Sequence, residues 1–389
     1  MDIWQKHIRP QWTFWLWGLI LIVPLICWLV WLCWPKVPIK LLIMDKTVLD
    51  DRVPEHLSLS WVLTHERYTN PSLESYDPIT DYMGFKPSNR PKFNTDDLEN
   101  FSMKELGALV NTFDGIYYTD TYGVYANEWF DKGSINEHSG LVYGGLTAKD
   151  AHLIVQHYQA KKLTLLEFNL LASPTEAGPR QQVEQALGFR FTGWTGRVFD
   201  NLDTTNNPDL PRWVVRMYKD QHQGRYGLSG PGIVLVHENG TLDILADKKD
   251  LDSLVPTIVS SPQMQAEYGV PATMPYPFWI DIVEPIGDTK VLARYELHPN
   301  SRGDSILHLH HIPKTFAAAM QLGGRTNAWY FCGDWSDNPI PYNNTYFAGV
   351  QHISFLFYPI LDDTDRRSFF WKYYHPLIRQ ILANSFRKD

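Results

Sequence analysis

Acidic side chains follow three apolar runs of the sequence, at the points where buried β-strands are expected to end. Asp45 follows the run 39–44, Asp120 follows 115–119, and Glu167 follows the residues LTLL. In an open parallel sheet, the carboxyl ends of neighbouring strands share one edge, where ligands bind. Carboxylates at such an edge can act as general acid and base, hold a hard cation or bind sugar hydroxyls. We therefore predict a catalytic cluster of these three acids, with Glu167 as the acid or base.

Other polar or small residues accompany the same strand ends. Lys46 follows Asp45 directly, Asn169 comes two residues after Glu167, and Gly144 and Gly145 follow the short run 141–143. We expect Asn169 to orient a substrate, and the lysine and the two glycines to contact it. In the alternative interpretation, the acids at strand ends cap helices and accept hydrogen bonds from turn amides.

The segment Gly-Trp-Thr-Gly-Arg at 193–197 is a second candidate for substrate contact. It sets the indole of Trp194 beside the guanidinium of Arg197, an arrangement suited to stacking on a sugar ring or holding an anion. Alternatively, the segment is a tight loop whose tryptophan fills the interface between the two halves of the chain.

Two further motifs carry polar groups. His308 and His310 would lie on one face of an expected strand at 305–312, a spacing that zinc sites use, but the spacing names no third ligand, so we predict no metal. The residues Asp-Trp-Ser-Asp at 334–337 follow the strand expected at 328–332. They form either a polar rim or an Asx turn, and the Asx turn is the preferred interpretation.

Several familiar mechanisms find no motif in this sequence. It contains no G-x-S-x-G, GxxxxGK, GxGxxG or HExxH pattern, which disfavours serine hydrolases, nucleotide hydrolases, dinucleotide oxidoreductases and zincins. Of its three cysteines, Cys27 and Cys33 lie in an apolar segment, which leaves Cys332 alone in the rest of the chain. An internal disulfide or a cysteine metal site is therefore excluded for that part. We expect no cofactor.

The elements that position these residues alternate between strand and helix in the first half. Apolar runs predict buried strands at 39–44, 115–119, 141–143 and 163–168. Helical patterns occur at 54–68, 103–113 and 148–160, and the last begins with Thr147 and Asp150 in a capping arrangement. The polar, proline-rich stretch 71–100 is expected to be irregular. Repeated strand–helix–strand units predict a parallel sheet with helices on both faces.

The second half is richer in hairpin signals. One hairpin is expected over 232–245 with Asn239-Gly240 at its turn, and another joins 278–284 to 291–297 around Gly287-Asp288. The end, 368–386, is typical of an amphipathic helix. The predicted fold is a doubly wound, mostly parallel α/β domain at 38–230, followed at 231–389 by a mixed or antiparallel β extension with this C-terminal helix.

The first-half strand ends (DKTV, DTYGVY, YGGLT, EFNLLASPT) resemble those of the class I glutamine amidotransferase-like, flavodoxin-like superfamily. More narrowly, the chain is similar to membrane-anchored bacterial members associated with cell-surface polysaccharide clusters. The resemblance implies the fold and the location of the site. The resemblance does not imply glutamine hydrolysis, because an amidotransferase needs a nucleophilic cysteine in a G-x-C-x-G turn. Cys332 has Tyr330 where this pattern needs its first glycine.

Residues 12–34, from Trp12 to Trp34, contain no charged side chain. Twenty or so apolar helical residues span the hydrocarbon core of a bilayer, so we predict a transmembrane helix behind a tail at 1–11. Seven tryptophans lie within the first 34 residues, several of them near the ends of this segment, where indoles favour the headgroup layer. A cleaved signal peptide is disfavoured because Trp31-Leu32-Cys33-Trp34-Pro35 offers no small-residue cleavage site.

Charge bears on partners and location. The chain has 35 basic and 43 acidic residues and a net charge of −8, which disfavours a nucleic-acid partner. Residues 41–389 contain 31 basic and 42 acidic side chains, a net charge of −11, so this part of the chain is not attracted to anionic lipids. Lysines and arginines flank the apolar segment on both sides and give no clear orientation; we favour an extracytoplasmic body on a single-pass membrane protein.

Two functions fit these predictions. In the first, the protein is an accessory subunit of a cell-surface polysaccharide synthesis or export system, binding glycan and docking on a membrane-embedded glycosyltransferase or exporter. In the second, it is a glycan-processing hydrolase that uses the carboxylate cluster at the strand ends. The accessory role is slightly preferred, because the spacings assemble no complete mechanism and a fold alone confers none.

Overall fold

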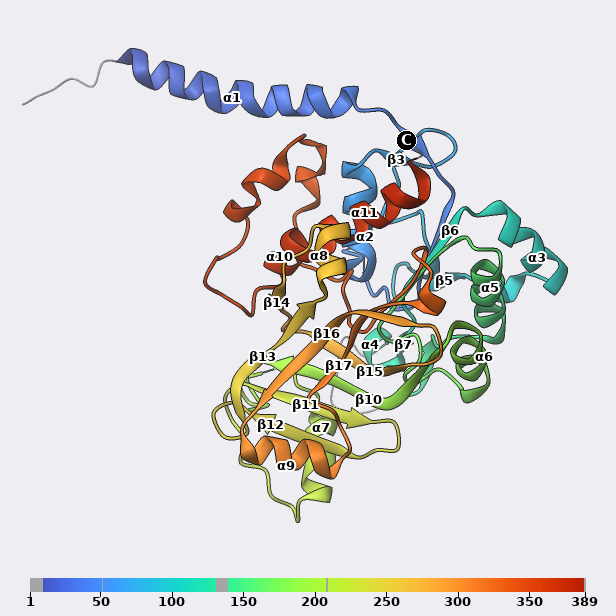
Figure 1. Ribbon diagram of the computed structural model, residues 1–389, viewed down its shortest axis with the longest axis vertical. Helices are drawn as coiled ribbons and strands as arrows, with labels where there is room; N and C mark the ends of the chain where they lie inside the picture. Colours follow the sequence, from blue (N-terminus) through green and yellow to red (C-terminus); the bar gives the residue numbers. More distant parts are fainter. Residues whose placement is uncertain (1–9, 51, 131–138, 208, 388–389) are drawn as a thin grey trace, which may run out of the picture.

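Strands from both halves of the chain pair in one large mixed sheet. The computed structural model describes residues 10–50, 52–130, 139–207 and 209–387, with side chains from residue 22 onward. Within this described part the sheet has ten strands, in the order β14-β13-β16-β17-β18-β9-β6-β2-β4-β5. A separate antiparallel sheet has the order β12-β11-β10-β15 and lies at the lower end of the molecule in Figure 1.

The middle of the large sheet is parallel. Its parallel strands are β2 (Leu41–Asp45), β4 (Met83–Pro87), β6 (Gly115–Asp120), β9 (Leu163–Glu167) and β18 (Ala328–Phe331). Every residue of β2, β6, β9 and β18 is buried, as continuous apolar runs predict for strands covered on both faces. The predicted strands at 39–44, 115–119, 163–168 and 328–332 are therefore confirmed.

Antiparallel strands extend this sheet on both sides. They are β5 (Phe93–Asp96), β13 (Leu251–Ser260), β14 (Thr273–Pro275), β16 (Lys290–Pro299) and β17 (Thr315–Gln321). The four-stranded sheet contains β10 (Phe189–Phe199), β11 (Gly232–His237), β12 (Leu242–Ala246) and β15 (Trp279–Pro285). Because β13, β14, β16, β17 and β18 complete the sheet begun by β2, the predicted division at residue 230 runs through one sheet.

Helices cover the parallel strands. α3 (Met103–Thr112), α5 (Ala148–Gln159) and α6 (Ala177–Leu187) lie together on the right in Figure 1, whereas α2 (Pro54–His65), α8 (Pro262–Tyr268) and α11 (His375–Phe386) lie above and to the left. α10 (Arg366–Phe369) and a π turn (Phe370–Tyr374) lead into α11. The capping box predicted for Thr147 and Asp150 opens α5. The helices expected at 54–68, 103–113, 148–160 and 368–386 are all present, the last in these three pieces.

The remaining elements are short or lie outside the large sheet. They are α4 (Ala126–Trp129), α7 (Arg212–Gln221), α9 (Ser301–Leu309), β1 (Val37–Pro38), β3 (Tyr68–Thr69), β7 (Val124–Tyr125) and β8 (Leu141–Tyr143). The hairpin predicted around Asn239-Gly240 is β11 and β12, whose pairing runs from Gly232↔Ala246 to Val236↔Leu242. The chain is therefore a mixed α/β protein with a large mixed sheet.

Four element predictions were wrong. The stretch 71–100 contains β4 and β5, and 141–143 forms β8, which pairs with β7 outside the large sheet. β15 and β16 flank the predicted turn at Gly287 but do not pair with each other, because β15 joins β10 and β16 inserts between β13 and β17. Residues 305–312 are largely helical, since Asn300 accepts hydrogen bonds from the amides of Arg302 and Gly303 and so caps α9.

α1 (Pro10–Cys33) precedes the body and lies along its top edge in Figure 1. Its last turns contact the body: the Trp31 indole donates to the His65 carbonyl oxygen (3.0 Å), and the Ala348 amide donates to that of Cys27 (3.1 Å). Among the described residues, no helix is both long and apolar enough to cross a membrane. The tail at 1–9 lies outside the described residues, and the side chains of 10–21, which include the first ten residues of the predicted span, lie outside the described side chains.

Candidate functional site

A large open cavity lies at the carboxyl edge of the parallel strands. Its volume is about 1440 Å³, and its walls come from residues after β2, β6, β9 and β18 and from strands β10 and β15. The turn after β18 is joined to β15 by an isolated bridge between Gly333 and Ile280, which brings residues 334–337 against Trp279. The two sheets therefore enclose the edge where the sequence placed its candidate acids.

Asp120 is the predicted acid that lines this cavity. Its carboxylate accepts a hydrogen bond from the Tyr122 amide (2.6 Å) and from the Asn169 side chain (3.3 Å). Asn169 also lines the cavity and adopts a left-handed backbone (φ 63°) that asparagine tolerates. Burial, opposed by the Tyr122 amide and reinforced by Asp45, raises the pKa of Asp120 to about 7. Asp120 can therefore exchange a proton near neutral pH.

Asp45 lies at the end of β2 but has no exposed surface. Its Oδ2 is 2.6 Å from His56 Nδ1, and its Oδ1 accepts from the Thr47 amide (3.0 Å). His56 Nε2 lies 2.7 Å from the Pro78 carbonyl oxygen, which can only accept, so Nε2 carries a proton. Asp45 and His56 thus form a closed pair behind the cavity wall. Asp45 acts on the cavity electrostatically, by raising the pKa of Asp120 and Glu55.

Glu167 is sealed beneath the cavity, with no exposed surface, and is not among the lining residues. Its Oε1 accepts from the Tyr117 hydroxyl, and its Oε2 accepts from the amides of Trp335 (2.8 Å) and Ser336 (3.0 Å). Burial raises the pKa of Glu167 to about 8 despite these three donors. The predicted role as catalytic acid or base conflicts with this placement. Glu167 holds the turn after β18 in place, which agrees with the alternative interpretation of acids at strand ends.

Further acids also line the cavity, among them Glu55 at the start of α2, which the sequence analysis did not select. Asp334 and Asp337 in the turn after β18 line it too, as the polar-rim interpretation of 334–337 predicted and not the preferred Asx turn. Buried Glu55 Oε2 and Asp334 Oδ1 have no hydrogen-bond partner in the described part of the chain. Burial, with Asp45 for Glu55 and Asp337 for Asp334, raises both pKa values well above the ordinary range. Buried carboxyl oxygens without a partner are rare in folded proteins, so these two need an explanation.

An aromatic and cationic wall faces the acids. The Arg197 guanidinium lies over the rings of Phe199 (4.5 Å), Trp279 (4.9 Å) and Phe278 (5.6 Å), and its Nε lacks a hydrogen-bond partner. Trp279 is half-buried and stacks on Phe168 (5.6 Å between ring centroids). The prediction of Arg197 as a substrate contact therefore fits its place in the cavity wall.

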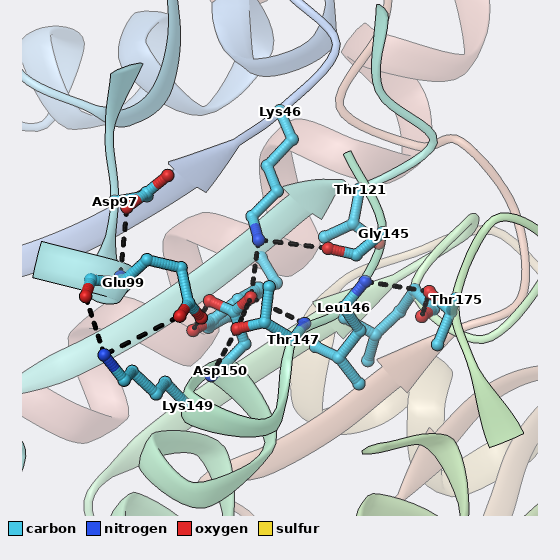
Figure 2. A network of polar contacts seen from close by, with 12 residues as sticks. Lys46, Asp97, Glu99, Thr121, Gly145, Leu146, Thr147, Lys149, Asp150 and Thr175 are labelled. Atoms are coloured by element: carbon cyan, nitrogen blue, oxygen red, sulfur yellow. Dashed lines mark hydrogen bonds and ion pairs between the residues drawn. The ribbon is translucent and has the colours of Figure 1, made fainter. Parts of the chain in front are cut away.

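The prediction of Lys46, Gly144 and Gly145 as substrate contacts is corrected, since all three act inside the fold. Figure 2 shows Lys46 reaching the Asp150 carboxylate (2.5 Å) and the Gly145 carbonyl oxygen (3.0 Å), and Lys46 is only 2% exposed. Gly144 has a φ of 145°, and a Cβ there would lie 2.5 Å from the Cα of Gly123. The glycines thus let two loops cross closely, while Lys46 ties them to α5.

Trp194 and the two histidines also lie elsewhere. Trp194 is buried against His237 and His310 (5.0 and 5.3 Å between ring centroids), as the alternative interpretation of a filling side chain predicted. The tight loop expected at 193–197 is wrong, because these residues belong to strand β10. His308 is exposed on helix α9, whereas His310 follows that helix and contacts Asp243 Oδ2 (3.0 Å). The two imidazoles therefore do not share a strand face.

Cys332 is fully buried at the end of β18. Burial, with a smaller contribution from Asp281, raises the pKa of its thiol well above the ordinary value. A protonated, inaccessible thiol is not a nucleophile. This agrees with the missing G-x-C-x-G turn.

The missed cavity residues carried little sequence signal. Asp334 follows a strand whose parallel pairing with β9 was not predicted; with that pairing, its turn would have been assigned to the same edge. Trp279 was assigned to a hairpin that does not form. Arg366, which contacts Asp337 Oδ2 (3.2 Å), comes from the C-terminal segment, and nothing in its neighbourhood in the sequence indicates the cavity.

Comparisons with known proteins give one structural likeness. No protein-family model matches the chain, and no curated protein matches it in sequence. A solved structure of a glutamine amidotransferase from Thermotoga maritima is similar at a TM-score of 0.38 and 9% identity, covering 90% of this chain and 99% of that one. Because so low a TM-score carries no inference, the α/β class rests on the sheet topology described above.

Proposed function

We propose that the protein is a membrane-anchored accessory protein of a cell-surface polysaccharide synthesis or export system and binds the glycan in the cavity at the strand ends. The observation that carries the proposal is the composition of this cavity, whose lining combines aromatic and cationic side chains with carboxyl groups. We also propose that the first half of the chain is related to the amidotransferase-like superfamily whose strand ends it resembles.

Carbohydrate fits this composition better than a purely apolar or purely charged ligand. The C–H faces of a sugar ring stack on an indole such as Trp279, and its hydroxyls both donate and accept hydrogen bonds. Asp120 and Asn169 supply oxygen acceptors in the cavity lining, and Arg197 contributes a guanidinium to it. A volume of about 1440 Å³ accommodates several sugar units.

Replacing a cavity side chain is expected to weaken glycan binding. For Trp279→Ala we expect about a tenfold or greater rise in Kd, because the ring that stacks on the sugar is removed. Arg197→Gln should act in the same direction. Binding is measured by screening the full chain on an array of bacterial surface polysaccharides and titrating the best ligand.

The matched control lies on the same strand as Arg197. Arg190→Gln alters an exposed arginine of β10 that pairs with Glu284 and does not line the cavity, so its Kd should stay unchanged. Equal losses in Arg190→Gln and Arg197→Gln, or no polysaccharide bound by the unaltered chain, would contradict glycan binding in the cavity.

Anchoring in the membrane is the second part of the proposal. It is supported by the uncharged residues 12–34 and by apolar side chains that are 40–55% exposed on the described part of α1, from Ile22 to Leu32. The segment 353–361 adds exposed Phe355, Leu356, Ile360 and Leu361, more apolar surface than a water-facing loop needs. Fractionation of cells that express the full chain or a chain lacking residues 1–34 tests the anchor, and the full chain should sediment with membranes.

A hydrolase is the second candidate function, favoured by the raised pKa values of two acids on one wall. Burial raises the pKa of Glu55 well above its ordinary value, whereas Asp120, with a pKa of about 7, is partly ionised near neutral pH. In this mechanism Glu55 donates its proton to the leaving glycosidic oxygen, and the Asp120 carboxylate accepts a proton from the attacking water. These residues replace Glu167, which is sealed.

This second candidate predicts a pH profile. Hydrolysis should rise as Asp120 ionises through pH 7, and Asp120→Asn should lower kcat by about 100-fold or more, while Kd for the glycan changes little. The assay follows the appearance of new reducing ends in the bound polysaccharide between pH 5 and 9. Glycan binding without new reducing ends at any pH would leave the accessory role and exclude the hydrolase.

A further inference from the structure

A buried group of two histidines and a glutamate, none of which lines the cavity, lies where α2 ends and α11 begins. It consists of His65, Glu66 and His375, which are exposed by 5% or less. One ligand atom from each residue lies within 4.8 Å of the other two. We propose that this group binds a divalent transition-metal ion of the zinc class.

The hydrogen bonds of His65 leave a ligand atom facing the group. His65 Nδ1 lies 2.9 Å from the Thr345 carbonyl oxygen; because a carbonyl only accepts, Nδ1 carries the proton and Nε2 keeps its lone pair. Buried Nε2 has no hydrogen-bond partner in the described part of the chain. Metal-binding histidines are oriented in the same way, with the other ring nitrogen donating to a carbonyl or carboxylate.

His375 and Glu66 supply the other ligand atoms. His375 Nε2 is also buried without a hydrogen-bond partner and lies 3.6 Å from Glu66 Oε1. Tetrahedral ligands at zinc distances lie about 3.4 Å apart, so the His375–Glu66 pair already has nearly this spacing, and the group as a whole, whose atoms lie within 4.8 Å, would have to contract around an ion. The Gln351 side chain interacts with His65, and its buried Oε1 lacks a partner, which makes it a candidate fourth ligand.

The walls and charges around the group are compatible with a held ion. The His65 ring stacks on Trp61 (4.6 Å) and meets the Trp34 ring edge-on (5.7 Å), so it cannot easily turn away. Arg379 Nε lies 3.3 Å from Glu66 Oε1, and an amino nitrogen of the Arg387 guanidinium lies 3.6 Å from Glu66 Oε2. Both arginine side chains are at least 40% exposed. Their charges are therefore partly screened by water.

The place of the group gives the ion a structural role. The backbone carbonyl oxygen of His65 accepts a hydrogen bond from the Trp31 indole at the end of α1, and Thr345 lies in the turn that contacts α1. An ion bound by α2 and α11 would therefore fix the part of the body that holds this helix. Nitrogen and oxygen ligands without cysteine suit zinc, cobalt or nickel better than calcium or magnesium.

Metal analysis of the full chain tests the proposal. After purification without chelator, or after loading with Zn²⁺, we expect about one zinc per chain, and Zn²⁺ added to chelator-treated protein should raise Tm whereas Mg²⁺ should not. Co²⁺ should give the visible absorption of a four-coordinate site. His375→Gln and Glu66→Gln should each weaken zinc binding at least tenfold.

His157→Gln is the matched control, because His157 is also buried with both ring nitrogens unpaired but belongs to no such group among the described residues. It should bind zinc as the unaltered chain does. If His375→Gln does not fold, the Tm response of the unaltered chain to Zn²⁺ and Mg²⁺ still decides. No zinc bound and no Tm response would overturn the proposal and indicate a buried water at this position. Equal loss in His157→Gln would overturn it too.

Discussion

Glu167→Ala is expected to destabilise the protein by at least about 3 kcal/mol, because it leaves three buried donors without an acceptor, each worth about 1–3 kcal/mol. The donors are the Tyr117 hydroxyl and the amides of Trp335 and Ser336. Two of them belong to the turn that carries Asp334 into the cavity, so glycan binding should fall as well. Thermal and denaturant unfolding of the full chain measures the loss of stability.

Glu167→Gln separates this structural role from a catalytic one. The amide oxygen of glutamine can accept from Trp335 and Ser336, and its NH₂ can donate to the Tyr117 oxygen, whose own hydroxyl then donates to Tyr374, 3.1 Å away. We therefore expect a change in stability within about 1 kcal/mol near pH 5. If Glu167 were the catalytic acid or base, Glu167→Gln would instead abolish hydrolysis while leaving stability intact.

The raised pKa of Glu167 also predicts how the stability of Glu167→Gln and of the unaltered chain should differ with pH. The pKa of Glu167 is about 8 in the folded chain and ordinary in the unfolded chain, so between about pH 4.5 and 8 the folded state binds more protons. This contribution to stability is fully present below pH 4.5 and is lost as pH rises through 8. Glu167→Gln removes it and should therefore gain stability relative to the unaltered chain as pH rises over this window. Parallel stability curves for the two chains would contradict the raised pKa.

The sequence could locate the acidic edge but could not distinguish its members. Asp45, Asp120 and Glu167 all end buried parallel strands, as their apolar runs predicted. Which of them reaches solvent depends on what covers each strand end. Glu167 is covered by the turn after β18, and Asp45 by His56. Both partners are set by tertiary packing, which strand periodicity does not contain.

The part of the cavity wall that β15 supplies could not be predicted from the sequence, for a related reason. The pattern of alternating apolar residues marks β15 and β16 as strands, but it does not say that they join different sheets. That choice brings Trp279 and Arg197 opposite Asp334. Of two histidines spaced for a strand, His308 lies in α9 and His310 directly follows it, because the Asn300 cap favours a helix over the apolar alternation. Local pattern thus gave most elements of the parallel core, and long-range pairing decided the site.

Lys46→Met is expected to destabilise the protein by about 3–5 kcal/mol, because it leaves a buried carboxylate without its counter-charge. Lys46 and Asp150 are exposed by only 2% and 1% in their side chains, and 2.5 Å separates Nζ from Oδ2. The Gly145 carbonyl oxygen loses its donor at the same time. Because Asp150 opens α5 and Gly145 lies in the loop before it, the crossing of the two loops should loosen, which thermal unfolding of the full chain records as a lowered Tm.

Two companion variants distinguish the loss of a charge partner from a general effect of removing a lysine. Lys149→Met removes a neighbouring lysine whose Nζ is 3.6 Å from Glu99 Oε2 at the surface (Figure 2), a pair worth only about 0–1 kcal/mol. Asp150→Asn added to Lys46→Met should restore part of the stability, since no unpaired charge then remains buried while Thr147 still donates to residue 150. A loss below about 1 kcal/mol in Lys46→Met, or equal losses in Lys46→Met and Lys149→Met, would show that Lys46 is not the tether of these loops and would return it to the set of possible substrate contacts.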